Sequence, residues 1–248
     1  MDLVVGQVDT SIVLCAYNEE DMIDKTIARV DQTMMNTDIT YEIIVVDDGS
    51  LDNTRLKAIR YKKHKPKSNL KVVSYGKNLG KGNAIKTGLQ YASGRNIVLL
   101  DSDLDIDPNQ IPAYIEALKS NDIAIASKWH PKSHVSMSSR RKLLSIGFNN
   151  GSRLLTGIKL KDTQTGLKAF KRIVFDKVSM NLTVNRYAFD LELMATCNHS
   201  GFKIIELPVR VRIDHLSSVN LREILRMSFD VIKVAYRLVF LKKYYHRS

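Results

Sequence analysis

Residues 96–105 read NIVLLDSDLD, a run of apolar residues that ends in three aspartates at alternate positions. The apolar run shows no polar alternation, which is typical of a strand buried on both faces of a parallel sheet. Asp101, Asp103 and Asp105 come at the carboxyl end of this strand, where open α/β sheets bind their ligands. The stretch therefore predicts a buried strand with a polar site directly after it.

Similar runs rich in Val and Ile recur on both sides of this stretch. They predict strands at residues 11–16, 42–46, 70–74, 96–100 and 122–126, with helices between them at 20–35, 53–63, 81–92 and 108–119. Asp107 suits an N-cap because Pro108 fits the first helical position, and Gly94 suits the end of the helix before it. Strands that alternate with helices predict an α/β fold with a mainly parallel, mixed sheet flanked by helices.

The second half of the chain is organised differently. A polar, basic loop at 128–142 leads into a predicted helix at 140–155, the segment DTQTGLKAFKR, an acidic helix and a predicted strand at 203–212. No linker divides the chain. We therefore expect one domain over residues 1–220 and a basic amphipathic helical tail over residues 221–248.

The tail carries a basic stripe. At about 100° per residue, one side of a helix collects Arg222, Arg226, Lys233 and Arg237, and the opposite side is apolar. Two interpretations stay open. The helix packs on the domain with its charges in water, or it lies at a membrane surface with its basic side chains facing anionic headgroups.

The composition of the chain indicates what kind of partner the protein binds. The chain has 248 residues and a formal net charge of +12, which favours an anionic partner such as nucleic acid, a phosphorylated small molecule or an acidic membrane. Nucleic acid is not expected, because basic and aromatic residues do not interleave and no zinc-ligand spacing occurs. Two cysteines, no apparent signal peptide and no long apolar run predict an intracellular protein whose membrane contact is peripheral.

The three aspartates after residue 100 predict a metal site. Carboxylates are costly to bring together unless a cation neutralises them. Oxygen ligands without His or Cys are typical of Mg²⁺ or Mn²⁺. We therefore expect Asp101, Asp103 and Asp105 to be metal ligands.

Two further strand ends are polar. Tyr17 follows the first strand and offers a ring on which a base can stack, and Asp48 follows the second and can accept hydrogen bonds from a base or ribose. The segment NLGKGNA at 78–84 is similar to a glycine loop that binds anions at the start of a helix, although it lacks the GK[ST] ending of a P-loop. It either contacts phosphate or serves to shape the loop.

Four motifs in order carry a family resemblance: CAYNEED (15–21), VVDDGSLDNT (45–54), NLGKGNAIKTGL (78–89) and LDSDLDIDPNQI (100–111). Together they resemble the GT-A glycosyltransferases of glycosyltransferase family 2. DTQTGLKAFKR (162–172) and NRYAFDLELM (185–194) are similar to the branch that glycosylates polyprenyl phosphates, and most similar to dolichyl-phosphate β-glucosyltransferases. The resemblance implies a GT-A, Rossmann-like fold and inverting transfer of a hexose to a dolichyl or other polyprenyl phosphate.

The resemblance also assigns roles to individual residues. It implies that the nucleoside is surrounded by Tyr17, Glu19, Val46 and Asp48. It implies that the metal and the diphosphate are held by Asp101 and Asp103, with Ser102 between them and Asp105 as a third ligand. Lys128 matches a residue that contacts phosphates and Arg141 one near the acceptor phosphate, so Asp103, Lys128 and Arg141 are expected to carry catalysis.

Some alternatives stay open at this point. The donor is UDP-glucose or, as the alternative, GDP-mannose, and the expected place of action is the cytoplasmic face of a membrane. Two interpretations of Asp190 and Glu192 are open. They act as a pair of carboxylates that serve as the catalytic base or, as we favour, they orient a loop or pair with arginines. Residues 217–220 read SSVN where the mannose synthases of this branch carry a lysine-containing lid over the diphosphate.

Overall fold

The computed structural model describes residues 8–66, 68–186, 188–213 and 221–239. Its centre is a seven-stranded sheet with the order β3-β2-β1-β4-β7-β5-β8. These strands are β1 (Thr10–Ala16), β2 (Tyr41–Asp47), β3 (Leu70–Ser74), β4 (Asn96–Asp101), β5 (Ile123–Ser127), β7 (Lys168–Lys171) and β8 (Ile204–Pro208). All pairs are parallel except those of β7, which runs antiparallel to β4 and β5. The predicted α/β fold with a mainly parallel, mixed sheet is confirmed.

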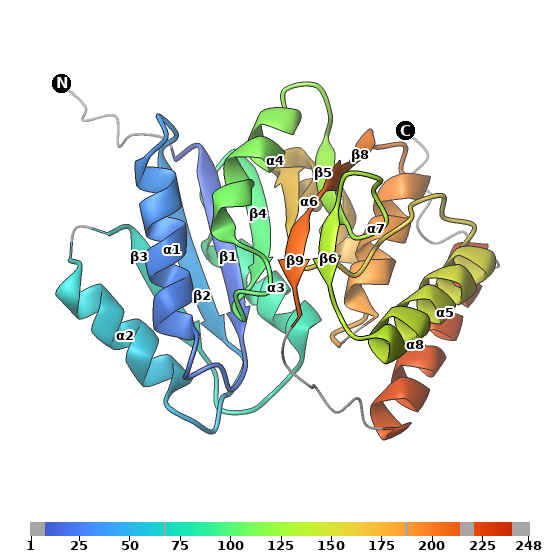
Figure 1. The fold of residues 1–248 in the computed structure, drawn as a ribbon, viewed down its shortest axis with the longest axis horizontal. Coiled ribbons are helices and arrows are strands. Elements are labelled where there is room, and N and C mark those ends of the chain that lie inside the picture. Colours follow the sequence, from blue (N-terminus) through green and yellow to red (C-terminus); the bar gives the residue numbers. More distant parts are fainter. Residues whose placement is uncertain (1–7, 67, 187, 214–220, 240–248) are drawn as a thin grey trace.

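Helices cover both faces of the sheet (Figure 1). They are α1 (Ile23–Met35), α2 (Thr54–His64), α3 (Lys81–Tyr91), α4 (Ile111–Ala117), α5 (Ser139–Thr156), α6 (Arg172–Val178), α7 (Phe189–His199) and α8 (Leu221–Val239). Side chains of β1 alternate between two cores, because successive strand residues point to opposite faces. Ile12 belongs to the core formed with residues of α1, α2 and α4, and Val13 belongs to the core formed with residues of α3, α6, α7 and α8.

Hydrophobic periodicity explains the difference between the two layers. Helix α1 buries Ile23, Ile27, Val30 and Met34, spaced along one stripe, as expected of a helix with its other side in water. Helix α7 is buried over most of its length, from Phe189 to Cys197. It lies between the sheet and α8, which contacts it directly, so it needs apolar residues on several sides.

Several local predictions are confirmed, two are wrong, and two strands were not predicted. Asp107 caps the turn at Pro108–Gln110 by accepting a hydrogen bond from the amide of Asn109. The predicted strand at 203–212 is two strands, since β8 ends at Pro208 and β9 (Arg210–Arg212) pairs with β6 (His134–Ser136) in a separate sheet. Strands β6 and β7 were not predicted. Gly94 does not close α3, which ends at Tyr91 and is followed by Ala92 in an extended conformation.

The tail forms a helix, as predicted, from Leu221 to Val239. Its side chains are described from Phe229 to Leu238, so the orientations of Arg222 and Arg226 lie outside the described residues, as do residues 217–220 at the position of the lid. Val231, Val234 and Leu238 are buried. In the described part of the chain, no helix combines the length and apolar character needed to cross a membrane.

Candidate active site

The candidate site lies where the strand order reverses, between β1 and β4, at the carboxyl ends of both strands. Open α/β sheets place their ligand crevice at such a point. A cavity of about 600 Å³ opens here. Its lining comes from the ends of β1, β2 and β4 and from α3 and α7: Cys15, Ala16, Tyr17, Glu19, Asp48, Asn78, Gly80, Lys81, Ala84, Asp101, Ser102, Asp103, Gln164, Arg186 and Asp190.

Two smaller hollows, which we call branches, share Asp103 with this cavity. The first, of about 330 Å³, is lined by Glu19, Asp21, Asp103, Asp105 and Arg141 among others. The second, of about 120 Å³, adds Lys128 and Gln164 to Asp103, Asp105 and Arg141. Asp103 lines all three hollows, so it lies at their junction.

The backbone of the DSD loop is held in a fixed shape. The Ser102 hydroxyl donates to the Cys15 carbonyl at 2.8 Å, and the Thr26 hydroxyl donates to the Ser102 carbonyl at 2.7 Å. Leu104 adopts a left-handed conformation with φ of 59°, which is unusual for a residue with a branched side chain and is concentrated at functional sites. The Asp105 amide closes the turn by donating to Oδ1 of Asp103 at 3.0 Å.

A chain of buried charges runs from Asp101 into the protein. Lys81 Nζ lies 2.7 Å from Oδ1 of Asp101 and 3.3 Å from Oδ2 of Asp190. Asp190 also pairs with Lys168 at 2.7 Å, and Lys168 donates to the Thr165 carbonyl. Although burial opposes it, the positive charges of Lys168 and Lys81 lower the pKa of Asp190. Asp190 is therefore ionised and a weak base.

Acidic side chains are in excess around Asp103 and Glu19. Burial, and next the charge of Asp103, raises the pKa of Glu19 to about 7. Burial and the neighbouring Asp101 raise the pKa of Asp103 as well. A group of oxygen ligands with unrelieved like charge fits a hard divalent cation such as Mg²⁺ or Mn²⁺.

The three predicted metal ligands do not form a preassembled site. In the described part of the chain, no three acidic, His or Cys side chains are arranged to hold a metal ion between them. The reason lies in their contacts, since Asp101 turns one oxygen to Lys81 and Asp103 turns one to the Asp105 amide. Magnesium commonly takes one or two carboxylates and completes its shell with water and substrate phosphates, and Asp101 and Asp103 suit such a site.

Asp48 has internal partners for both of its oxygens. It accepts hydrogen bonds from the Tyr75 hydroxyl at 2.7 Å, the Asn78 side-chain amide, and the backbone amides of Leu79 and Gly80. The amides of Gly82 and Asn83 donate to the Asn185 carbonyl. Of the two interpretations of the glycine loop, the structure therefore favours a loop shaped from within, because these four amides are engaged by the protein itself.

Gly80 is required by this arrangement. Its φ is 100°, and a Cβ at this position would lie 2.4 Å from the Asn185 carbonyl oxygen. Side chains other than glycine rarely adopt this conformation. The loop brings the α3 N-terminus, and with it Lys81, against Asp101.

Of the remaining residues assigned to the nucleoside, Tyr17 and Glu19 line the same cavity and Val46 does not. The Tyr17 ring is exposed at the rim, where a base can stack on it. The Val46 side chain is fully buried in the core, so any part it takes in nucleotide binding passes through its backbone. A side chain at Gly166 would collide with Asp101, because a Cβ there would lie 2.2 Å from the Asp101 carboxylate.

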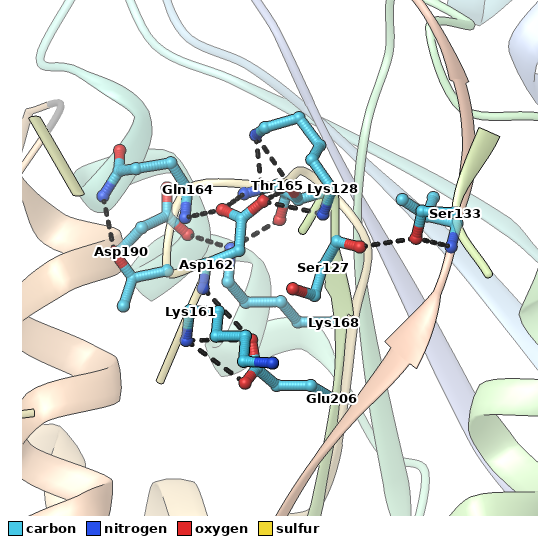
Figure 2. Close-up of polar contacts among 12 residues, drawn as sticks. Ser127, Lys128, Ser133, Lys161, Asp162, Gln164, Thr165, Lys168, Asp190 and Glu206 are labelled. Atoms are coloured by element: carbon cyan, nitrogen blue, oxygen red, sulfur yellow. Dashed lines mark hydrogen bonds and ion pairs between the residues drawn. The ribbon is translucent and has the colours of Figure 1, made fainter. Parts of the chain in front are cut away.

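Lys128 belongs to a network centred on Asp162. Figure 2 shows the Asp162 carboxylate beside Lys128, Thr165 and Gln164. Lys128 Nζ lies 3.2 Å from Asp162 and donates to the Thr165 hydroxyl at 2.8 Å. The side chain is largely buried, yet it lines the smaller branch together with Arg141. Both predicted phosphate-contacting residues thus lie beyond Asp103.

Some site residues were missed from the sequence. Lys81, Gln164 and Arg186 line the main cavity but had no role assigned.

Glu192, one of the two candidate bases, instead holds the loop at 183–184. Its carboxylate accepts hydrogen bonds from the Thr183 amide, the Thr183 hydroxyl and the Val184 amide, and lies 3.6 Å from Arg237. The favoured structural interpretation is confirmed for Glu192. Asp190 also makes ion pairs, but with lysines in place of arginines.

Comparison with known proteins identifies the family of this chain. Residues 11–179 match the family model described as glycosyl transferase family 2. The dolichyl-phosphate beta-glucosyltransferase of Dictyostelium discoideum is 27% identical over 94% of this chain and 76% of its own length. The enzyme of the same name from Drosophila melanogaster is 33% identical, over 82% and 66%. The human one is 32% identical, over 80% and 66%.

Solved structures show the same fold. Glucosyl-3-phosphoglycerate synthase from Mycobacterium tuberculosis, solved with UDP, superposes with a TM-score of 0.69 at 23% identity, over 93% of this chain and 79% of that one. The same enzyme with Mn²⁺, UDP and glucosyl-3-phosphoglycerate gives a TM-score of 0.68 at 23% identity, over the same shares. The match over residues 11–179 covers more than half of the sequence, and the chain belongs to glycosyl transferase family 2.

Proposed function

We propose that this enzyme transfers glucose from UDP-glucose to dolichyl phosphate or a similar polyprenyl phosphate, with inversion at the sugar carbon. The names of its relatives support this, since the Dictyostelium, Drosophila and human proteins are dolichyl-phosphate beta-glucosyltransferases. The expected place of action is the cytoplasmic face of a membrane, with peripheral contact.

The observation that carries the proposal is the shape of the cavity around Asp103. A hollow of about 600 Å³ adjoins two branches at this residue, one lined by Arg141 and the other by both Arg141 and Lys128. A nucleotide sugar in the main cavity would direct its sugar carbon toward Asp103. A phosphate in the branch would meet two cationic side chains, which are the groups that bind phosphate most strongly.

The protein's own residues would divide the work in the following way. Tyr17 stacks on the base at the rim, and Asp48 holds the loop that forms the nucleoside wall. Asp101 and Asp103 would hold a divalent cation, which supplies charge stabilisation for the departing diphosphate. Arg141 receives the acceptor phosphate, and Lys128 contributes positive charge to the same branch.

No protein base is needed for this reaction. A phosphate monoester is largely dianionic at neutral pH because its second pKa is about 6, so its oxygen attacks without losing a proton. Asp190, a buried carboxylate that lines the main cavity, pairs with two lysines that lower its pKa. We assign it a positioning role for Lys81.

The test is a donor panel with one acceptor. Radiolabelled UDP-glucose, GDP-mannose and a UDP-uronic acid are each offered with a polyprenyl phosphate and Mg²⁺ or Mn²⁺, and the label that enters the lipid phase is counted. We expect transfer from UDP-glucose, and loss of that transfer with EDTA and with Asp103→Asn. Transfer from GDP-mannose in its place would overturn the donor assignment, and no transfer from any donor would overturn the acceptor class.

A further inference from the structure

Gln164 lies where the main cavity meets the smaller branch. It lines both hollows, and it shares this position with Asp101 and Asp103, the expected metal ligands at the leaving diphosphate. The branch adds Lys128 and Arg141, which are expected to face the acceptor phosphate. In an in-line displacement the sugar carbon lies between the attacking and the leaving oxygen. The sugar of a bound donor would therefore pass next to Gln164.

The backbone of Gln164 is held by a buried carboxylate. Its amide donates to Oδ1 of Asp162 at 3.0 Å, and Asp162 is almost completely buried. The Asp162 carboxylate also lies 3.2 Å from Nζ of Lys128. Two residues after Gln164, the backbone of Gly166 packs directly on the Asp101 carboxylate. The loop at 162–166 is therefore fixed against both ends of the reaction, as a precise binding group requires.

The Gln164 side chain keeps most of its hydrogen-bonding capacity for a ligand. It is half-buried, and Figure 2 shows it extending away from the Asp162 carboxylate. Its nitrogen donates to the Thr163 hydroxyl at 3.4 Å, which is long for a hydrogen bond. A side-chain amide has two N–H donors and an oxygen with two lone pairs. Within the described part of the chain, one donor and the oxygen are thus unused.

The neighbouring polar groups of the main cavity are already engaged by the protein. The ammonium of Lys81 pairs with Asp101 and Asp190, and the Ser102 hydroxyl donates to a backbone carbonyl of β1. A hexose presents uncharged hydroxyl groups on adjacent carbons, which suit a partner that both donates and accepts. Gln164 offers such a group next to the expected position of the sugar.

We propose that Gln164 binds the hydroxyl groups of the transferred hexose and thereby determines which sugar the enzyme accepts. The inference rests on the proposed function, because it takes the occupant of the main cavity to be a nucleotide sugar. The amide donates to one hydroxyl and accepts from its neighbour. A site that hydrogen-bonds a substrate hydroxyl strongly rejects an analogue that lacks it, so Gln164 is a specificity-determining residue.

The first experiment measures donor binding by calorimetry with Mg²⁺ and without any acceptor, so it does not depend on transfer. Gln164→Ala should bind UDP-glucose about tenfold more weakly than wild type, because the sugar loses its hydrogen bonds. It should bind UDP as tightly as wild type does, because UDP has no sugar to lose. Equal losses for the two ligands, or no loss for either, would overturn the inference.

Thr163→Val is the matched control. It keeps a side chain of similar shape at a buried position and removes the hydroxyl that Gln164 contacts. The affinity for UDP-glucose should stay at the wild-type value. A loss as large as that of Gln164→Ala would mean that the amide holds the loop and does not bind the sugar, which would overturn the inference.

A second experiment identifies the hydroxyl group. UDP-glucose analogues, each lacking one hydroxyl of the glucose, are titrated into wild type and into Gln164→Ala. Removal of the hydroxyl that Gln164 binds should weaken binding to wild type about tenfold and leave binding to the variant unchanged, because the two changes remove the same contact. If every analogue weakens both proteins equally, Gln164 does not contact the sugar.

The outcomes separate this inference from the proposed function. Wild type that binds UDP-glucose but transfers nothing to a polyprenyl phosphate would remove the acceptor and leave the inference standing. If wild type binds GDP-mannose in place of UDP-glucose, the donor assignment falls, and the inference stands or falls on the same comparison between GDP and GDP-mannose. Normal donor binding by Gln164→Ala with a raised KM for the acceptor would overturn the inference and assign Gln164 to the acceptor phosphate.

Discussion

Nζ of Lys81 lies 2.7 Å from Oδ1 of Asp101, the first aspartate of the DSD motif. The same ammonium lies 3.3 Å from Asp190. Although burial opposes protonation, the two carboxylates raise the pKa of Lys81 far above its usual value, so the side chain is charged. Lys81 therefore neutralises a carboxylate that a divalent cation would also bind.

We predict that Lys81→Met strengthens the binding of Mn²⁺ to the protein in the absence of nucleotide. Removal of the competing ammonium leaves Asp101 free to bind the metal, and a contact between unit charges near a protein surface is worth enough for roughly a tenfold change in affinity. Electron paramagnetic resonance of free Mn²⁺ measures the binding directly.

Lys81→Arg is the control for this prediction, because it keeps the positive charge at the same site. Its Mn²⁺ affinity should stay close to that of wild type. If Lys81→Met binds Mn²⁺ no better than Lys81→Arg does, Lys81 does not compete with the metal.

Asp103→Asn should abolish transfer and leave the protein at least as stable as before. Loss of stabilisation of the leaving diphosphate costs several kcal/mol of barrier, hence about a thousandfold or more in rate. Stability should not fall, since burial and Asp101 raise the pKa of Asp103, so its charged form is disfavoured in the folded state at neutral pH. Transfer assays and thermal unfolding at pH 7 check the two parts.

Asp21→Asn is the matched control, because Asp21 lines the same branch from an exposed position. It should change the rate only slightly. Near-normal turnover of Asp103→Asn with Mg²⁺ would remove Asp103 from the reaction.

Arg141→Ala should impair use of the acceptor more than binding of the donor. A hydrogen bond to a charged group is worth about 1.5–3 kcal/mol, so KM for a water-soluble prenyl phosphate should rise about ten- to a hundredfold. Binding of UDP, measured by calorimetry, should stay unchanged. Lys142→Ala, an exposed neighbour on the same helix, serves as control, and a loss of UDP affinity in Arg141→Ala would move Arg141 to the donor side.

The sequence allowed the strands and their order along the chain to be predicted because their signal is local. Runs such as IVLL that are bounded by turn residues are typical of buried strands, and polar residues at their ends mark the ligand edge of the sheet. Strand β7 has no such signal, since it reads KAFK. Its Lys168 is almost fully buried because Asp190, 22 residues away in the chain, provides the opposite charge.

The same limit applies to the site. The DSD motif predicted which residues line the cavity but not which groups their oxygens contact. Asp48 accepts hydrogen bonds from residues about 30 positions further along the chain. Gly94 is needed because the β1 backbone passes 2.5 Å from where its Cβ would lie, and no helix-capping rule contains that information.

Glu42, far from the site, shows a tightly compensated buried charge. Oε1 accepts hydrogen bonds from the Ser11 hydroxyl at 2.6 Å and from the Ser93 amide at 2.6 Å, and Oε2 accepts from Lys71 Nζ at 2.6 Å. Burial raises its pKa, but the hydrogen bonds from Lys71, Ser11 and Ser93 together outweigh burial and lower the pKa from 4.5 to about 2.

We predict that Glu42→Gln lowers the free energy of unfolding at pH 7 by about 3 kcal/mol, the equivalent of the pKa difference. A carboxyl group with a lowered folded-state pKa stabilises the protein fully above its unfolded pKa, and this contribution disappears as the pH falls from about 4.5 to about 2. The variant and wild type should therefore converge in stability at acid pH. Urea unfolding at pH 7 and pH 3 measures the difference.

Glu116→Gln is the control, because Glu116 forms an exposed pair with Lys119, and such pairs contribute little. An equal loss for Glu42→Gln at both pH values would show that the shape of the side chain, and not its charge, stabilises the fold.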